Sequence, residues 1–399
     1  MRLISASPLS MPNLPIDTVI DSPTFTEFIA PAENLLPTIT PLKSSSNREL
    51  TFTFHFQLRS LIYYHVEECT SARHLLQMIK NDSLTQQLLM PDGGLGKSTN
   101  YYANANRGLE QMCQLFDKLA KKVSRKLSTI HSQLGDLVAI DGSLIDATLS
   151  MTWADYTSAT NKVKAHLGFD LNRGLPRKVH LTVGKEAERP FVSSILRSGE
   201  TGVLDRGYQD HQRFDEWIQE GKHFVARLKK NTKWQVKRHL PFDKGEQTFF
   251  FAEVMLGDKN HSMTHPVYLV GFRCRRKVYW IATSRKDLSA KQIAFIYSLR
   301  WEIECLFSWW KRHLKVYHLI SRNPHGTLLQ LLAGLITYLL LILYCYRVYG
   351  ESKPSIFRVR QLRWRIRNDA RETVSLISVG ITVDAISIIL LTFIQIWKI

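Results

Sequence analysis

The chain has 399 residues, 44% of them hydrophobic and 22% charged, a composition typical of an ordinary globular protein that can bury a sizeable core. Its 53 Lys and Arg residues against 35 Asp and Glu residues give a net charge of +18. This favours a polyanionic partner, because neutralised phosphates release condensed counterions. The five cysteines include no CxxC pair, which argues against a disulfide framework or a cysteine zinc site and fits a reducing, cytoplasmic location.

The N-terminal third divides into two parts by composition. Residues 1–48 contain much Pro, Ser and Thr and few periodic patterns, so we expect a loosely ordered leader. After it, apolar residues recur at helical spacing, as at Leu109, Met112 and Leu115. This pattern predicts a helical N-terminal domain over residues 49–130, for which we expect a DNA-binding role.

Strand patterns begin at Leu137 and alternate with helical patterns over residues 131–230. One apolar run ends at Asp141 and another at Asp205, and a helical pattern around Trp217 follows. Strands that alternate with helices predict an α/β fold.

This alternation stops over residues 231–288, where several strand-like runs follow one another with no helix between them. We therefore expect a β-rich insertion in the α/β core. A long helix is predicted from Ser289, within a second part of the core at residues 289–346. Residues 347–399 are first basic and then apolar.

Asp141 and Asp205 are candidate metal ligands because each follows an apolar strand, and ligands of α/β sheets bind beyond strand ends. Two such carboxylates can share a divalent ion, and an acid from a facing helix can hold a second one. A pair of ions can assist both the attacking and the leaving oxygen of a phosphoryl transfer. Taken singly, a strand-end aspartate is more often a turn residue.

The predicted helix after Ser289 carries Tyr297, Arg300, Glu304 and Lys311. At about 100° per residue these four fall within an arc of roughly 60°, so we expect them on one face. The face suits an acid that holds a metal with cations that contact phosphates. An Arg–Glu pair at this spacing is otherwise common surface decoration.

The spacing Tyr297-x2-Arg300-x3-Glu304-x6-Lys311 resembles the Y-R-E-K signature of DDE transposases of bacterial insertion sequences, in insertion sequence family four. Other stretches resemble the family's regions around the first and second aspartates and after the catalytic helix. They are Ile140-Asp141-Gly142-Ser143, Asn161-Lys162-x-Lys164-x-His166, Leu204-Asp205-Arg206-Gly207-Tyr208 and Ser321-Arg322-Asn323-Pro324.

The resemblance implies a ribonuclease-H-like catalytic core interrupted by the β-rich insertion. It implies that Asp141, Asp205 and Glu304 bind two Mg²⁺ ions, for which Mn²⁺ can substitute, and catalyse DNA cleavage and strand transfer. The implied partners are the transposon-end repeats and target DNA, with a homodimer in the synaptic complex and no membrane. The resemblance also implies that Tyr297, Arg300 and Lys311 contact phosphates near the cut. Arg206, Lys164 and His166 are further candidates for DNA contacts, and a solvated basic loop is an equally good interpretation of Lys164 and His166.

Several other features have competing interpretations. The arginines between Arg358 and Arg367 suit DNA contacts or a solvated helix face, as do the cations of Lys222–Arg238. Trp234 and Trp280 could each stack on a flipped base, and the sequence selects neither. A zinc site at His261 and His265 is disfavoured, because no glutamate follows His261.

Two apolar runs, Leu328–Tyr346 and Ile377–Ile399, have lengths that could suit a membrane helix, but we favour buried core helices. Gln330, Gly334 and Thr337 make the first run a poor lipid-facing surface. The functions that remain open beside an active transposase are a DNA-binding descendant that no longer cuts, a structure-selective nuclease and a membrane protein.

Overall fold

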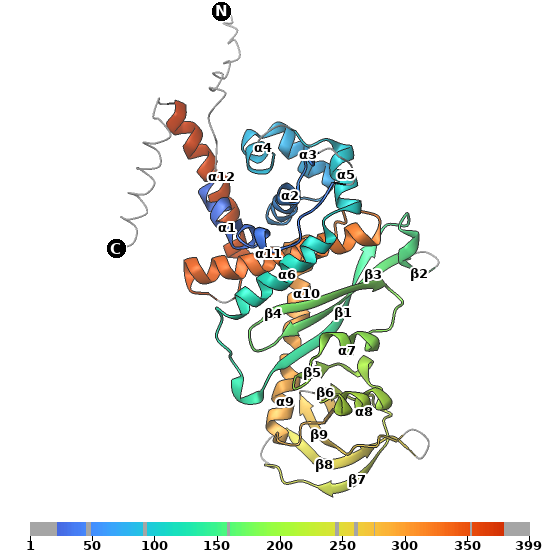
Figure 1. Ribbon diagram of the computed structural model, residues 1–399. Helices are drawn as coiled ribbons and strands as arrows, with labels where there is room; N and C mark the ends of the chain where they lie inside the picture. Colours follow the sequence, from blue (N-terminus) through green and yellow to red (C-terminus); the bar gives the residue numbers. More distant parts are fainter. Residues whose placement is uncertain are drawn as a thin grey trace, which may run out of the picture.

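The structure is a computed structural model that describes residues 22–44, 49–90, 94–157, 160–243, 247–258, 262–274, 276–351 and 353–378. The N-terminal helices and the last two helices gather at one end of the molecule, and a large mixed sheet extends away from them (Figure 1). The N-terminal helices are α1 (Pro23–Glu33), α2 (Phe54–Val66), α3 (Ala72–Asn81), α4 (Ser83–Leu89), α5 (Lys97–Asn106) and α6 (Leu109–Ser124). The helical character predicted for this region is therefore observed.

Helix α1 differs from the expected loosely ordered leader. Ser22 caps its first turn, and Phe25, Phe28 and Ile29 are buried in the main core. These aromatic and aliphatic side chains stabilise an ordered helix in spite of the Pro-rich composition around them. The part of the predicted leader before Ser22 lies outside the described residues.

The central strands are β1 (Leu137–Ala147), β3 (Thr160–Asp170), β4 (Leu175–Val183), β5 (Thr201–Leu204) and β6 (His223–Arg227). Their order is β4-β3-β1-β5-β6, and β2 (Asp155–Thr157) pairs with the end of β3. Strands β3 and β4 are antiparallel to their neighbours, whereas β5 and β6 run parallel to β1. This is the ribonuclease-H-like arrangement that was expected.

The β-rich segment continues this sheet instead of forming a separate body. It contains β7 (Trp234–His239), β8 (Thr248–Leu256), β9 (Val267–Cys274) and β10 (Lys277–Thr283). Strand β10 pairs with β6 through Ile281 and Arg227, so the sheet continues in the order β6-β10-β9-β8-β7.

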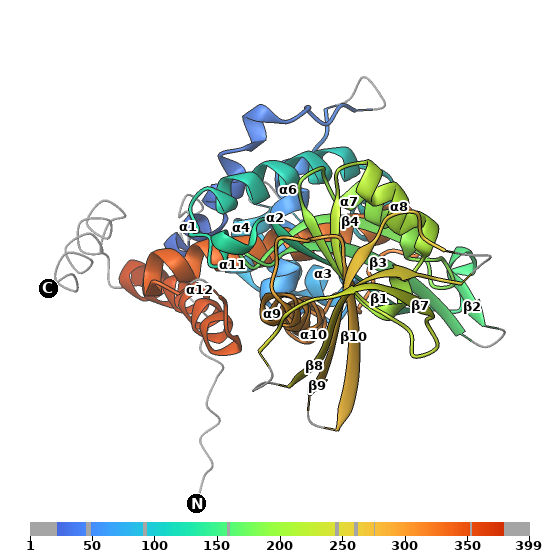
Figure 2. The same ribbon diagram turned by 90° about the horizontal axis from the view of Figure 1, so that it is seen from below.

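Helices cover both faces of the sheet. Helices α9 (Ala290–Leu299) and α10 (Trp301–His313) pack on one face, beside β10 and β1 (Figure 2). Leu137 and Ala139 of β1 point to this face. Helices α7 (Val192–Ile195) and α8 (His211–Gln219) cover the other face, to which Val138 and Ile140 point.

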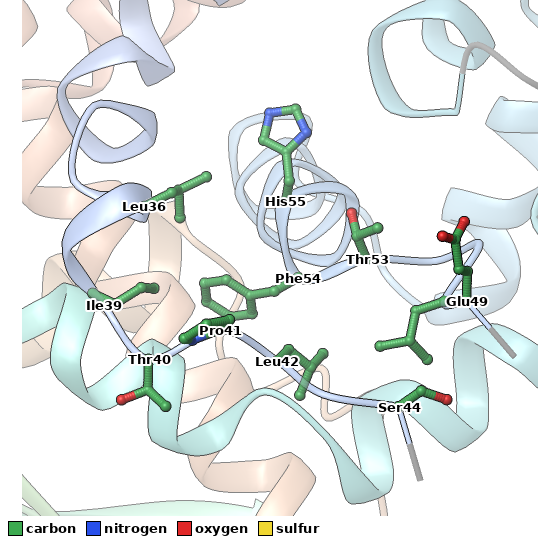
Figure 3. A pocket seen from close by; sticks show the side chains of 11 residues that line it. Leu36, Ile39, Thr40, Pro41, Leu42, Ser44, Glu49, Thr53, Phe54 and His55 are labelled. Carbon is green, nitrogen blue, oxygen red and sulfur yellow. The ribbon is translucent and has the colours of Figure 1, made fainter. Parts of the chain in front are cut away.

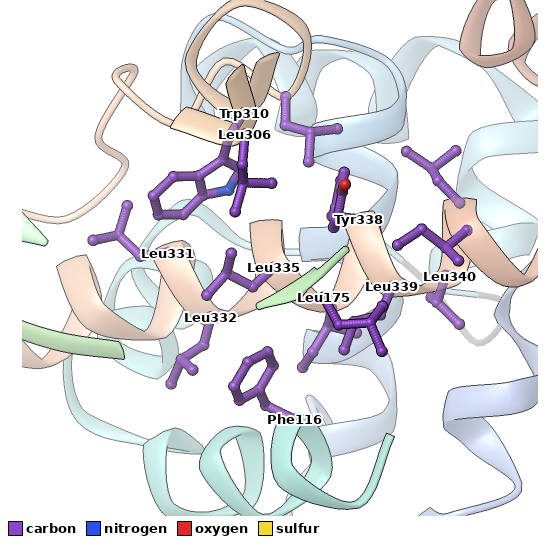
Figure 4. Packing of buried hydrophobic residues seen from close by; sticks show 14 of the residues in the cluster. Phe116, Leu175, Leu306, Trp310, Leu331, Leu332, Leu335, Tyr338, Leu339 and Leu340 are labelled. Atoms are coloured by element: carbon purple, nitrogen blue, oxygen red, sulfur yellow. The ribbon is translucent and has the colours of Figure 1, made fainter. Parts of the chain in front are cut away.

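The apolar run at residues 328–346 is a buried core helix, as we favoured. It belongs to α11 (Pro324–Tyr349), which Asn323 caps and which ends at Gly350 in the left-handed conformation. Its most apolar 18-residue window is long enough to cross a membrane but is 94% buried in the protein. Figure 4 shows its leucines between Trp310 of α10 and Phe116 of α6.

The last described element is α12 (Ile356–Ser378), which packs against α1. The apolar run Ile377–Ile399 lies outside the described residues apart from its first two positions, which end α12.

Candidate active site

Asp141 and Asp205 lie at the same level on neighbouring parallel strands. The register pairs Ala139 of β1 with Val203 of β5, and each aspartate follows its paired residue by two positions. Two positions along a strand return a side chain to the same face, so both carboxylates point towards α9 and α10. Adjacent strands are about 4.8 Å apart, which brings the two acids close together.

The expectation that β1 ends at Asp141 is wrong, whereas β5 ends one residue before Asp205 as predicted. Strand β1 continues to Ala147 because β3 pairs with it along its whole length. Its parallel pairing with β5 stops at Ala139, so Asp141 occupies the point where one side of the strand loses its partner.

The predicted long helix is divided at Arg300, where α9 meets α10. The capping box of Ser289 and Gln292 starts α9. The amide of Arg300 donates to the carbonyl of Tyr297, and that of Ile303 donates to the carbonyl of Arg300, so the turn here is tighter than an α-helix. This junction lies directly over the two aspartates.

The four residues of the predicted helix face all contact β1, β5 or one another. The Tyr297 hydroxyl donates to Asp205 Oδ1 at 3.3 Å. Arg300 Nη1 lies 3.5 Å from Asp141 Oδ2, and its Nη2 donates to Glu304. Lys311 Nζ donates to the carbonyl oxygen of Leu144 at 2.6 Å. One helical strip thus joins all three acids through a tyrosine and an arginine.

Asp141 lies in an environment that disfavours its charge. Burial raises its pKa to about 6, although the hydrogen bond from the Gly142 amide and the Arg300 guanidinium both lower it. The charges of Glu188 and Glu304 raise it further. Burial, together with the charge of Asp205, raises the pKa of Tyr297 to about 12, so this tyrosine remains a hydrogen-bond donor.

Cationic side chains neutralise the three acids in this arrangement. Besides the Arg300 contacts, Arg227 Nη1 lies 3.7 Å from Asp205 Oδ1. Among the described residues no three His, Cys, Asp or Glu side chains form a ready-made metal cluster. The donor chemistry nevertheless fits Mg²⁺, which prefers carboxylate oxygens. Direct binding by both Asp141 and Glu304 requires Arg300 to leave the space between them.

A second group of polar residues lies on the opposite face of β1, and most of it was missed from the sequence. Glu188 packs against Gly142, and Lys164 Nζ lies 3.3 Å from Glu188 Oε1. Tyr208 is buried nearby in the core of that face. Nothing in the spacing of Glu188 distinguishes it from an ordinary loop acid.

The prediction that His166 contacts DNA is wrong for this arrangement. Its side chain is fully buried, stacks on Phe191 at 4.2 Å and contacts Thr182 Oγ1 at 2.8 Å. Strand pairing places it opposite Gly142 of β1. Lys164 is also largely covered, whereas Arg206 is exposed directly after Asp205.

The arginines of α12 are mostly occupied within the protein. Arg363 Nη2 lies 2.9 Å from Glu68, and Arg367 pairs with Glu67. Their main interaction is therefore with the helical domain, contrary to the DNA-contact interpretation. Arg360 and Trp364 remain exposed.

The remaining candidates are also explained by packing. Trp234 and Trp280 contact each other at 4.8 Å between ring centroids, and both pack on the core. His265 Nδ1 lies 2.7 Å from Asp215 Oδ1, whereas His261 lies outside the described residues. Within Lys222–Arg238, Lys222 and Arg227 form ion pairs and Lys230 is exposed.

A cavity of about 620 Å³ lies in the helical domain and not at the acids (Figure 3). Leu36, Ile39, Leu42 and Phe54 line it together with polar residues of the same two segments. It therefore does not belong to the candidate active site.

Residues 132–340, just over half of the chain, match the family model described as "Transposase DDE domain". The chain is similar to a protein of Sinorhizobium fredii named as transposase y4zB, with 28% identity over 60% of this chain and 68% of the relative. A transposase for insertion sequence element IS5377 of Geobacillus stearothermophilus is 29% identical over 48% of this chain and 52% of the relative. A transposase for insertion sequence element IS4SA of Synechocystis is 25% identical over 61% of this chain and 70% of the relative.

Proposed function

Because the chain belongs to the transposase DDE domain family, we propose that it catalyses metal-dependent DNA cleavage and strand transfer of a bacterial insertion sequence. The observation that carries the proposal is the shared level of Asp141 and Asp205 on parallel strands, beneath a helix that links Glu304 to Asp141 through Arg300. Burial and the charge of Glu304 raise the pKa of Asp141, and a divalent cation bound there would offset this cost of ionisation.

Asp141, Asp205 and Glu304 would hold two Mg²⁺ ions, with Mn²⁺ as a substitute. When bound, the ions would activate the attacking oxygen and stabilise the leaving oxygen of an in-line displacement at phosphorus. The raised pKa of Asp141 means that a proton competes with the ion at this carboxylate.

The cationic side chains of the same strip would bind DNA. Arg300 has a planar fork of donors that suits a phosphate, and ions that neutralise Asp141 and Glu304 would free this fork for the substrate. Lys311 and the exposed Arg206 would contact flanking phosphates. Tyr297, held by Asp205, would fix the position of the strand against the acids.

The proposed partners are double-stranded DNA at the element's ends and at the target, with two copies of the chain in the synaptic complex. The net charge of +18 supports DNA as the partner, because the excess of cationic side chains can contact the phosphate backbone of DNA.

The test uses the full chain, Mg²⁺ and labelled DNA that contains the genomic sequence flanking the gene. Asp141→Asn, Asp205→Asn and Glu304→Gln are each expected to abolish cleavage and strand transfer while DNA binding remains. Glu302→Gln is the matched control. Glu302 lies on the same helix as Glu304, but it forms an ion pair with Lys353 and is not one of the three proposed ligands. Binding without cleavage by the wild type in Mg²⁺ and Mn²⁺ would contradict the proposal and favour a non-cutting descendant.

A further inference from the structure

A fourth carboxylate, Glu188, lies directly behind the strand that carries Asp141. A Cβ atom added to Gly142 would lie 2.7 Å from Glu188 Oε1 and 2.9 Å from its Cδ. Gly142 follows the same alternation as Val138 and Ile140, so Glu188 lies on the face covered by α7 and α8. The glycine leaves the space that the carboxylate occupies.

Lys164 holds this carboxylate in place. Its Nζ lies 3.3 Å from Glu188 Oε1 and donates to the carbonyl oxygen of Glu186 at 2.9 Å. The Lys164 side chain is only 14% exposed, so its charge is directed inwards at Glu188 more than at solvent. The ion pair with this largely buried lysine fixes the position of the Glu188 carboxylate.

The Tyr208 hydroxyl provides an independent observation at the same place. Tyr208 is 1% exposed, and its hydroxyl has no hydrogen-bond partner of normal geometry in the described structure. Burial raises its pKa well above the usual value, and the charges of Glu188, Asp141 and Asp205 add to this effect. The buried hydroxyl therefore lies within electrostatic reach of three carboxylates, and its contact with Glu188 falls short of a hydrogen bond of normal geometry.

We propose that Glu188 and Tyr208 form the outer layer of the cation site and strengthen ion binding from behind Asp141. Glu188 adds a fourth carboxylate on the far side of β1, and its negative charge, partly offset by Lys164, favours a cation at Asp141. Tyr208 supplies a donor for a carboxylate or for one of the waters that Mg²⁺ retains. This inference rests on the proposed function, because it assumes that Asp141 holds an ion. Both are positioning residues, since neither is assigned a contact with the DNA.

The test measures Mn²⁺ binding to the full chain without DNA, from the electron paramagnetic resonance signal of free Mn²⁺. Glu188→Gln is expected to weaken Mn²⁺ binding about 10-fold, the lower end of outer-layer effects at metal sites. Glu186→Gln is the matched control, because the Glu186 side chain is exposed and only its carbonyl contacts Lys164. Binding by this control should equal that of the wild type.

Tyr208→Phe separates an ion-binding role from a structural one. Removing a hydroxyl that makes no hydrogen bond of normal geometry and lies close to the charge of Glu188 should leave thermal stability in EDTA unchanged or higher, while Mn²⁺ binding weakens. Unchanged Mn²⁺ binding in both Glu188→Gln and Tyr208→Phe, with Asp141→Asn weakened, would overturn this inference and leave the proposed function intact. Absence of Mn²⁺ binding in the wild type, or no effect of Asp141→Asn, would overturn the cation site itself and this inference with it.

Discussion

Arg300 Nη1 lies 3.5 Å from Asp141 Oδ2 while the same guanidinium donates to Glu304, so one arginine bridges two of the three acids of the site. The bridge joins the helix junction to β1 and occupies the space between two carboxylates. The guanidinium therefore neutralises the two acids in the absence of an ion, and it competes with any ion that they bind.

Arg300→Met should therefore strengthen Mn²⁺ binding in the absence of DNA. We expect an increase of several-fold, since removing a nearby cation lowers the competition for Asp141 and Glu304. DNA cleavage should fall, because the phosphate contact is lost as well. Calorimetric titration with Mn²⁺ measures the first effect, and Arg206→Met, which removes an exposed cation outside the bridge, is the control. Weaker Mn²⁺ binding in Arg300→Met would mean that the arginine supports the ion site instead of competing with it.

Asp141→Asn should stabilise the ion-free protein at neutral pH. The pKa of Asp141 is raised from 3.8 to about 6, so folding favours its protonated form. The stability that the protonated carboxyl contributes is complete below about pH 4 and is lost as the pH rises through about 6. An asparagine at this position does not ionise, so the variant does not lose this stability at higher pH. The gain well above pH 6 should reach at most about 3 kcal/mol, at 1.4 kcal/mol per pKa unit over the rise from 3.8 to about 6.

Thermal unfolding in EDTA between pH 4 and 8 measures this difference. The wild type and Asp141→Asn should have similar stability at pH 4 and diverge as the pH rises. A variant that is less stable than the wild type at pH 7 would show that the ionised carboxylate stabilises the fold.

Much of the site could be predicted from the sequence because its signals are local. The apolar run before Asp205 and the spacing from Tyr297 to Lys311 both survive in the structure, even though the helix divides at Arg300. The length of β1 could not be predicted in the same way. It depends on β3, whose antiparallel pairing extends the strand past Asp141.

The positions of the residues behind β1 could not be predicted without the register of the strands. His166 belongs to a stretch that resembles the family's region around the first aspartate, yet its ring is buried in the core, opposite Gly142 in the strand pairing. Glu188 becomes significant only because that glycine leaves room for it. The order of α1 was also hidden, since its proline-rich composition gives no sign of the core against which Phe25 and Phe28 pack.

Gly334→Ala should destabilise the protein and disturb the helix that carries Glu304. A Cβ atom at Gly334 of α11 would lie 2.7 Å from Trp310 Nε1 and 2.9 Å from Val316 Cγ1. Both neighbours are buried, so the expected cost is about 1 to 3 kcal/mol. Urea unfolding measures it, with Gly94→Ala as the control because nothing lies within 4 Å of its Cβ position. Equal stability of the two variants would contradict the close packing of α10 on α11.

The central claim is that Asp141, Asp205 and Glu304 hold the catalytic ions directly, and replacement of each acid by cysteine tests it. A thiolate is a poor ligand for Mg²⁺ but an acceptable one for softer ions. Each cysteine variant should lose DNA cleavage in Mg²⁺ by at least about 100-fold and regain a measurable part of it in Mn²⁺, whereas the corresponding alanine variants should stay inactive in both. Full cleavage by any one of the cysteine variants in Mg²⁺ would contradict the assignment of that acid as an ion ligand.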